Sequence, residues 1–218
     1  LKKERTSHTN RMRSLLILHG IDLKINRNFI NVLEQVKQWN GKALSEHLVE
    51  EIHREHERFE LINKQLKQLF AQKAQQLEQT NKQTRQIKQL KMLKGIGPVS
   101  SWNLVYEFFG WREFKNVKQV SAASGLVPTP YASGGSNIEQ GISKAGNRRV
   151  RTLMVELSWY WLRYQPNSHL SIWFNQRFGP NGKRMRRIGI VALARKLLVA
   201  LWKFLEKGQV PEGAMLKI

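Results

Sequence analysis

Residues 131–151 read YASGGSNIEQGISKAGNRRVR, and the rest of the chain is organised around this stretch. The stretch starts as a flexible loop and ends in arginines at a predicted helix start. Glycine permits positive φ and lets the backbone approach another molecule closely. The glycines that give the loop this freedom are Gly134, Gly135, Gly141 and Gly146.

The same stretch combines hydroxyls with permanently charged side chains. The hydroxyls belong to Ser133, Ser136 and Ser143, and the charged groups to Arg148, Arg149 and Arg151. Guanidinium groups suit phosphate, and a helix N-terminus offers amides that bind anions. The functional interpretation is a phosphate-handling site with a serine nucleophile. The alternative is a surface loop followed by an ordinary basic helix.

The composition indicates a polyanionic partner. Lys and Arg number 37 against 16 Asp and Glu, which gives the 218 residues a formal net charge of +21. Such a surplus repels itself unless a polyanion covers it, so nucleic acid is the expected partner and an anionic membrane surface the main competitor. The chain has no cysteine, which excludes disulfides, cysteine-based zinc sites and a thiol nucleophile.

The sequence shows neither a signal peptide nor a membrane-spanning pattern. Leu1–Arg13 is charged and lacks an apolar core. The most apolar run is Ile188–Leu205, but Arg195 and Lys196 lie at its centre, where charge is costly in lipid. We therefore expect a buried helix of an intracellular protein. Because residue 1 is leucine, we also expect a fragment or a processed product.

The N-terminal half is predicted to be helical. Leu1–Gly20 and Asn28–Trp39 show helical spacing of apolar residues and end at glycine signals. Leu44–Leu93 reads as one long helix in a 3.5-residue register that is apolar at both ends and polar in the middle, which predicts a coiled coil. The alternative is an antiparallel hairpin broken near Gln75–Lys82.

Two histidines on the long predicted helix share one face. His53 and His56 are three residues apart, but Arg54, Glu55 and Glu57 beside them favour a solvated surface. No third ligand converges on them, so we expect no metal site there.

Residues 93–98, LKGIGP, interrupt the helical pattern. Pro98 suits the first turn of a following helix, so the segment resembles a helix-hairpin-helix turn. Gly95 and Gly97 would let successive amides point outward as a nest for a DNA phosphate, with Lys94 adding charge. Such contacts hold the DNA backbone without reading its sequence. The alternative is a simple turn between helices.

The segments on either side of the central stretch have their own local signals. Glu113–Gly125 predicts a short helix ended by its glycine, and residues 126–130 are extended because proline biases its predecessor away from helix. Asn147 is a predicted N-cap. The helix after it has a predicted buried stripe of Val150, Leu153, Met154, Leu157 and Trp161.

A second basic turn precedes the apolar run near the C-terminus. It spans Gly179–Arg187 and contains Lys183, Arg184, Arg186 and Arg187. The aromatic residues near it are expected in the core rather than as platforms for bases, with Tyr160 open to either role. They are Trp159, Tyr160, Trp161, Trp173 and Phe174.

Several motifs together resemble those of transposases of insertion-sequence family 110, also called the 116 and 902 type. In order they are 95–97 GIG, 124–128 SGLVP, 133–135 SGG, 141–151 GISKAGNRRVR and 192–197 ALARKL. The resemblance covers about residues 90–207. Residues 3–5, 10–12 and 15–16 are similar to the end of that family's RuvC-like domain, and Leu44–Leu93 to its coiled-coil linker.

The resemblance implies a mainly α protein in three parts. Residues 1–42 would end an N-terminal RuvC-like domain, residues 43–93 would form a coiled-coil linker, and residues 94–218 would form a compact helical transposase domain with a helix-hairpin-helix motif. It implies a cytoplasmic, nucleoid-associated prokaryotic protein. Its partners would be DNA, a structured guide (bridge) RNA and, through the coiled coil, further copies of itself.

The resemblance also implies a chemistry. A serine attacks a DNA strand and forms a covalent phosphoserine bond, assisted by RuvC-like carboxylates that bind a divalent metal such as Mg²⁺. The nucleophile falls on Ser133, with Ser143 as the second choice. The residues expected to bind nucleic acid are Lys94, Gly95, Gly97, Gly134, Gly135, Lys144, Asn147, Arg148, Arg149, Arg151, Lys183, Arg184, Arg186 and Arg187.

The sequence departs from the family pattern in its acidic residues, and Ala132 stands where family members often have a second serine beside Ser133. No aspartate precedes Asp22, so the RuvC-like carboxylates are expected before residue 1 and no metal ligand is expected in this chain. Two hypotheses follow. The chain is the nucleophile-bearing part of a recombinase, or it is a non-catalytic remnant that only binds nucleic acid.

Overall fold

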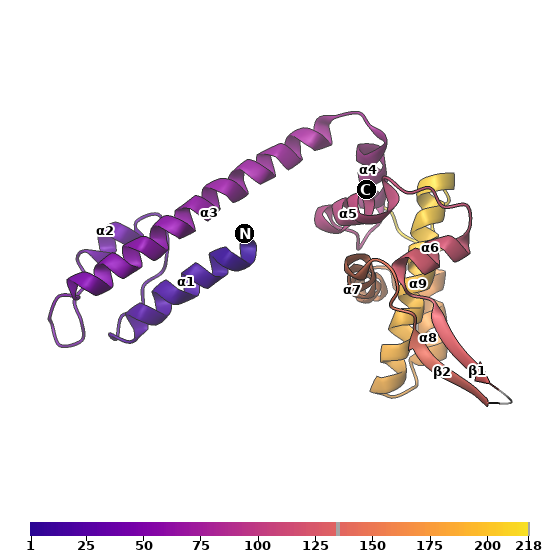
Figure 1. Ribbon diagram of the computed structural model, residues 1–218. Helices are drawn as coiled ribbons and strands as arrows, with labels where there is room; N and C mark the ends of the chain where they lie inside the picture. Colours follow the sequence, from indigo (N-terminus) through magenta and orange to yellow (C-terminus); the bar gives the residue numbers. More distant parts are fainter. Residues whose placement is uncertain (134–135, 218) are drawn as a thin grey trace. The chain divides into compact units, whose positions relative to one another are not determined.

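The computed structural model describes residues 1–133 and 136–217, and the side chains of residues 130–140 lie outside this description. The chain forms two compact units, Leu1–Glu78 and Gln79–Ile218. Each unit has its own hydrophobic core. Helices dominate both units (Figure 1), which confirms the predicted mainly α fold.

The first unit is built from two helices that pack along each other. They are α1 (Lys2–Ile17) and α3 (Glu46–Glu78), joined by a segment that contains the short helix α2 (Phe29–Leu33). Met12, Leu16, Phe29 and Ile52 form the buried centre of this unit. The predicted helix at Asn28–Trp39 is thus much shorter than its apolar pattern indicated.

A buried carboxylate links α1 to α3. Glu55 of α3 accepts hydrogen bonds from Arg58 at 2.7 Å and Arg11 at 3.3 Å, and its carboxylate lies 2.6 Å from the His8 ring. Burial alone would raise the pKa of Glu55, but the His8 and Arg11 contacts outweigh it and lower the pKa. The prediction that His56 lies on a solvated surface is wrong, because its ring stacks on Phe29 at 5.6 Å.

The long helix predicted over Leu44–Leu93 is interrupted. Helix α3 ends at Glu78 and α4 (Lys82–Met92) begins after Asn81, whose side chain accepts the Thr84 amide at 2.8 Å. The interruption falls inside the region where the alternative prediction placed it. Pairing of α3 with a further helix as a coiled coil stays a prediction.

The second unit is organised around its longest helix, α9 (Lys183–Lys207), which packs against helices from along the whole unit. Its neighbours are α4, α6 (Val117–Ser124), α7 (Arg148–Tyr164) and α8 (His169–Phe178). Leu193, Leu197 and Leu201 of α9 are fully buried. Between α4 and α6 lie α5 (Pro98–Leu104) and a π-helical segment, η1 (Val105–Phe109).

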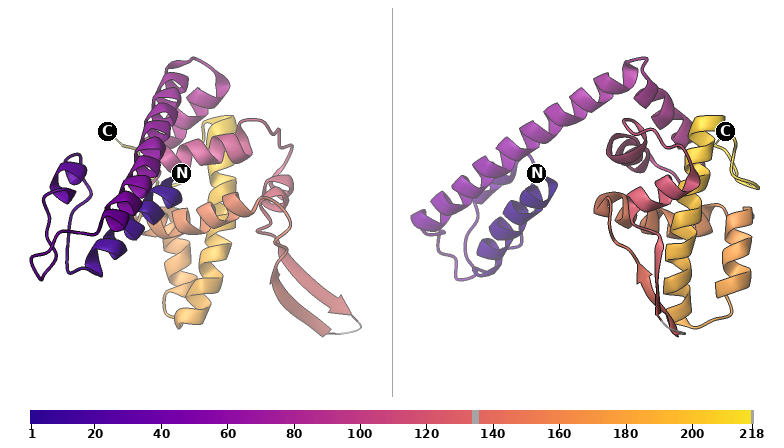
Figure 2. Two further views of the ribbon diagram at one scale, coloured as in Figure 1. Left: turned by 60° about the vertical axis from the view of Figure 1, so that its left-hand side comes forward. Right: turned by 45° about the vertical axis from the view of Figure 1, so that its right-hand side comes forward.

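A β-hairpin replaces the flexible loop predicted at the start of the central stretch. Strand β1 (Pro128–Ser133) pairs antiparallel with β2 (Ser136–Ile142), with Tyr131 opposite Ile138 and an irregularity between Pro128 and Pro130. The two prolines hid the strand, because proline is tolerated only in edge strands and at bulges. A two-stranded hairpin consists of edge strands alone. Figures 1 and 2 show both strands extending away from the helices of this unit.

Candidate nucleic-acid interface

The start of α7 is held in place by contacts within the protein. The Asn147 side chain caps the helix as predicted, accepting the amides of Arg149 and Val150 at 3.0 and 3.2 Å. Arg149 donates to the Glu107 carboxylate at 2.8 Å, and the Asn147 amide group donates to the Glu107 backbone carbonyl. The hydrogen bonds from Arg149 and Asn147 lower the pKa of Glu107. The side chain of Arg149 is 83% exposed, yet its guanidinium already has a counter-charge in Glu107.

Arg151 joins the α6 end to the loop before α7. Its Nη1 donates to the Lys144 carbonyl at 3.0 Å and to the Ser124 carbonyl at 3.3 Å. Two glycines make this approach possible. A Cβ on Gly125 would lie 2.4 Å from the Ala145 oxygen, and one on Gly146 would lie 2.4 Å from the Ala123 oxygen.

The glycine pattern of the motifs is therefore partly an internal packing requirement. Gly125 and Gly146 both have positive φ, at +69° and +120°, and both touch backbone of the same protein rather than an outside molecule. Gly141 differs, because φ is +87° and the space around a Cβ there is open. Lys144 is exposed and also has positive φ, at 55°, an uncommon conformation for a residue with a side chain.

The second basic segment is helical, not a turn. Helix α9 begins at Lys183 after Gly182, so Lys183, Arg184 and Arg187 lie in its first turns. These side chains are exposed, and no described residue forms an ion pair or hydrogen bond with them. Arg186 is exposed in the same turns. The positive end of the helix dipole adds to their charge.

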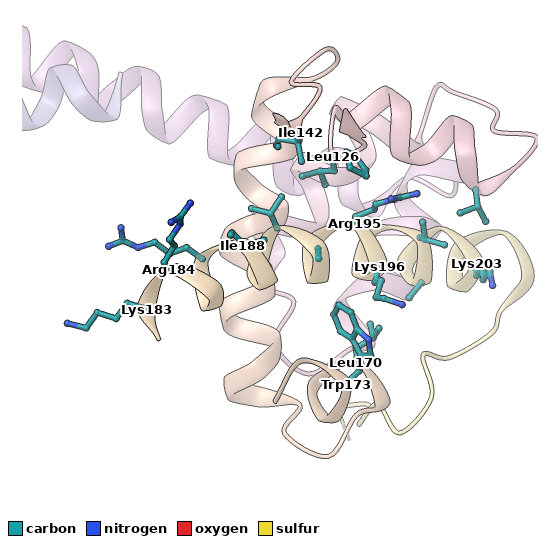
Figure 3. A pocket seen from close by; sticks show the side chains of 18 residues that line it. Leu126, Ile142, Leu170, Trp173, Lys183, Arg184, Ile188, Arg195, Lys196 and Lys203 are labelled. Carbon is teal, nitrogen blue, oxygen red and sulfur yellow. The ribbon is translucent and has the colours of Figure 1, made fainter. Parts of the chain in front are cut away.

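A groove of about 1220 Å³ runs along one face of α9, and it contains these cations. Its walls come from the root of the β-hairpin and from α8. Figure 3 shows Leu126 and Ile142 on one side of α9 and Leu170 and Trp173 on the other. Ile188, Val191 and Val199 of α9 add apolar surface between them. Lys183 and Arg184 project from one end of the groove (Figure 3).

The groove has more cations along its length. Arg195 is held by a 3.4 Å hydrogen bond from its Nε to the Ser121 hydroxyl, and the Lys196 ammonium lies 4.6 Å from the centroid of the Trp173 ring. The residues that line the groove include Lys183, Arg184, Arg187, Arg195, Lys196 and Lys203, and none of the described lining residues is acidic. This groove, named here the α9 groove, has an apolar floor and a cationic edge.

The sequence analysis missed the α9 groove although its signal was present. Arg184, Ile188, Val191, Arg195 and Val199 recur at the three- and four-residue spacing of one helix face. The interpretation of Ile188–Leu205 as buried is correct for the opposite face alone. Trp173 was expected in the core, but it is half-buried on the groove wall. Trp161 and Phe174 are buried as predicted.

The turn at residues 93–98 forms hydrogen bonds with the C-terminal tail of the same chain. The amides of Lys94 and Ile96 donate to the carbonyls of Met215 and Leu93, so the predicted row of outward amides is wrong for these two groups. The Lys217 ammonium donates to the Ile96 carbonyl at 2.6 Å. Gly95, with φ of +94°, packs its backbone against the Tyr164 side chain, whereas a Cβ on Gly97 would meet nothing.

Gln165 completes this arrangement. Its side chain donates to the carbonyls of Lys94 and Met215 at 2.8 Å and accepts the Met215 amide at 2.7 Å. The C-terminal tail, in which sequence alone showed no signal, is thus bonded to the turn. Lys94 itself stays exposed.

The predicted nucleophiles lie on the hairpin. Ser133 ends strand β1, with its side chain outside the described part, and Gly134 and Gly135 lie outside the described residues. Ser143 follows β2 directly, and its amide donates to the Val127 carbonyl at 2.8 Å. Ile142, next to Ser143, lines the α9 groove. Arg148 is exposed at the start of α7.

Among residues 1–129 and 141–217, whose side chains the structure describes, no cluster of three or more His, Asp or Glu side chains is arranged to hold a metal ion. The described residues therefore do not fit the divalent metal that the resemblance implies. Within the same residues, no helix combines the length and the apolar character needed to cross a membrane.

Comparison with known proteins identifies relatives of this chain. Residues 87–171 match the family described as Transposase IS116/IS110/IS902. A putative transposase of Sinorhizobium fredii, y4rJ, is 40% identical over 228 residues, covering 100% of this chain and 57% of that protein. The transposase for insertion sequence element IS1328 of Yersinia enterocolitica is 27% identical over 213 residues, covering 96% of this chain and 61% of that protein.

A third relative aligns with a shorter region. The transposase for insertion sequence element IS1111A of Coxiella burnetii is 31% identical over 115 residues, or 52% of this chain and 31% of that protein. The chain spans less than two thirds of the length of each of these relatives.

Proposed function

We propose that this chain is the DNA-handling part of a transposase that exchanges strands through a serine, because residues 87–171 match the IS116/IS110/IS902 transposase family and the whole chain aligns with a putative transposase. One observation carries the proposal. The hairpin root, through Pro128, Gly141 and Ile142, lines the same groove as the cations at the start of α9 that have no partner among the described residues. The hairpin that bears both candidate nucleophiles thus borders a surface suited to a DNA backbone.

The proposed reaction is a phosphoryl transfer. The Ser133 hydroxyl oxygen attacks a DNA phosphorus, a serine–phosphorus bond forms, and the bond from phosphorus to one deoxyribose oxygen breaks. The proton lost by the serine ends on the released sugar hydroxyl, so the step needs no redox partner. A hydroxyl is a weak nucleophile, so the step needs stabilisation of the charge on the phosphoryl oxygens. Lys183, Arg184 and Arg187 are candidates to supply it, because they line the groove that the hairpin root borders and no described residue pairs with them.

The remaining parts of the proposal rest on the resemblance. A guide RNA would select the DNA, copies of the chain would pair through α3, and residues 1–42 would be RuvC-like. The divalent metal would be bound by carboxylates other than the described residues of this chain, and no step is assigned to it here. Gly97 is the residue of the 93–98 turn at which a phosphate contact is most readily tested, because a side chain there meets no neighbour.

The test of the nucleophile is a covalent protein–DNA adduct. The chain is joined in cis to the acidic N-terminal portion of a relative and incubated with labelled DNA that carries an element end. We expect a labelled protein band that survives denaturation. Ser133→Ala should abolish the band, and Ser143→Ala, the matched control on the same hairpin, should retain it.

The other outcomes are equally informative. A band that persists in Ser133→Ala but not in Ser143→Ala would transfer the role to Ser143. If no adduct forms although DNA is bound, the non-catalytic hypothesis holds and the proposed reaction is wrong.

A further inference from the structure

We propose that the α9 groove binds an unpaired DNA strand, with its bases against the apolar floor and its phosphates along the cationic edge. This inference rests on the proposed function, which makes DNA the substrate. It adds that the groove prefers single-stranded to duplex DNA, and that Trp173 provides this preference by stacking on a base.

The charge of the groove extends along a path of suitable length. Lys183 and Lys203 mark its ends and lie about 30 Å apart at ~1.5 Å of rise per residue. Arg187, Arg195 and Lys196 lie between them. A series of cations without an intervening carboxylate suits a phosphate backbone. This electrostatic attraction contributes to affinity for DNA, but it does not distinguish single-stranded from double-stranded DNA.

The floor of the groove decides between paired and unpaired DNA. Ile188, Val191 and Val199 of α9 present apolar side chains among the cations, and Ile142 adds apolar surface from the hairpin wall. A duplex turns its phosphates and sugars outward and keeps its bases stacked inside. It would therefore leave the apolar side chains of the groove exposed to water. The bases of an unpaired strand are exposed and cover apolar and aromatic surface, as they do in grooves that bind single strands.

The wall of the groove offers a ring on which a base can stack. Trp173 is half-buried, and its indole lies below the Lys196 ammonium at 4.6 Å. The Lys196 ammonium covers one face of this ring, so a phosphate that binds Lys196 and draws it aside leaves that face for the attached base. Arg or Lys beside an aromatic ring is a recurrent arrangement where a base stacks on protein.

The groove is continuous with the hairpin. Pro128 and Gly141, from the roots of both strands, line its wall. A strand that lies along α9 therefore leads to the segment that contains Ser133 and Ser143. The groove is suited to hold a strand opened from its duplex at the root of the hairpin, where Ser143 follows β2, whereas Ser133 lies at the other end of strand β1.

The test measures binding of the full chain to a labelled oligonucleotide of about ten thymidines and to a blunt-ended duplex of about ten base pairs. The wild-type chain should bind the unpaired strand more tightly than the duplex. Trp173→Leu should weaken binding of the unpaired strand about tenfold, the effect of losing one stacked base. Duplex binding should stay within about twofold of wild type, because the phosphate contacts are kept.

A matched control separates stacking from a general loss of tryptophan. Trp159→Leu removes an exposed tryptophan of α7 that does not line the groove, and it should change neither affinity. Lys196→Gln changes an exposed side chain with little risk to folding, and it should also weaken the unpaired strand more than the duplex.

Several results would overturn the inference. Equal or tighter binding of the duplex, with Trp173→Leu and Lys196→Gln affecting both forms alike, would mean that the groove holds a duplex backbone. An oligouridine that displaces the thymidine strand at a lower concentration would assign the groove to RNA, and an acidic helical peptide that does so would assign it to protein. A chain that binds neither form of DNA would contradict the proposed function itself.

Discussion

The two basic helix starts of the second unit look alike in sequence and differ in structure. At the start of α7, Arg149 pairs with Glu107 and Arg151 donates to two backbone carbonyls. At the start of α9, Lys183, Arg184 and Arg187 have no partner among the described residues and line a groove. The difference lies in what each helix start faces.

This contrast shows how much a run of arginines depends on its surroundings. The first turn of α7 lies against η1 and the end of α6, which supply a carboxylate and carbonyl oxygens. The first turns of α9 face solvent beside apolar surface. We infer that the arginines of α7 mainly build the site, whereas the cations of α9 bind the DNA. This division of roles predicts how substitutions in each helix start change stability and DNA affinity.

Gly146→Ala should be the most damaging single change near the hairpin. A Cβ there would lie 2.4 Å from the Ala123 carbonyl oxygen, and φ of +120° is unfavourable for alanine. We expect the free energy of unfolding to fall by about 3 kcal/mol or more, since both overpacking and backbone strain contribute. Urea unfolding monitored by tryptophan fluorescence measures the change.

Gly141→Ala is the control for that change. It also introduces a side chain at positive φ, but into open space, so it should cost only about 1 kcal/mol. If the two variants lost equal stability, the close packing of the α6–α7 junction would not be the reason for the glycine at position 146.

Arg151→Ala should come next. It removes the donor that joins the Ser124 and Lys144 carbonyls, so we expect a loss of about 1–3 kcal/mol in the free energy of unfolding. Arg148→Ala, one turn earlier and exposed, should leave stability within about 0.5 kcal/mol of wild type. The reverse order of stabilities would contradict a structural role for Arg151.

Glu107→Gln should have the smallest effect of these changes, and it should act on DNA affinity rather than on stability. It removes the counter-charge of Arg149, making the start of α7 resemble that of α9, so DNA affinity should rise by about two- to fivefold at low salt. Unchanged or weaker DNA binding, measured by anisotropy, would mean that Arg149 does not compete with DNA for this carboxylate.

The pH dependence of that variant follows from the lowered pKa of Glu107. A carboxyl group whose pKa is lower in the folded state stabilises the protein above its unfolded pKa. This contribution disappears as the pH falls through the lower, folded value. Glu107→Gln should therefore change affinity equally at pH 6 and pH 8. The difference between variant and wild type should shrink only as the pH falls below 4.5, the ordinary carboxyl value, because the lowered pKa keeps Glu107 charged down to there.

Local chemistry in the sequence predicted many of these elements. Asn147 caps α7, Gly125 ends α6 with positive φ, and Val150, Met154, Leu157 and Trp161 form the buried stripe of α7. Each of these features depends on residues close together in the chain, where hydrogen bonding and periodicity are visible. The mainly helical fold followed from the same signals.

The features that sequence did not predict depend on contacts between distant residues. The carbonyl of Met215 accepts the Lys94 amide, and Glu107 reaches Arg149, across separations that no local pattern reveals. The hairpin was not predicted because its first strand contains two prolines. Trp173 lines the α9 groove because α8 packs beside α9. The charge of each basic segment was clear, but the partners that decide its role were not.

The salt dependence of duplex binding shows whether the cations of α9, rather than the arginines of α7, contact DNA phosphates. One arginine is changed in each helix start. Arg187→Gln should reduce the slope of log K against log salt by about 0.9, the value for one phosphate contact. Arg149→Gln should leave the slope nearly unchanged, because Glu107 already neutralises Arg149. A loss of slope in Arg149→Gln with none in Arg187→Gln would contradict the account.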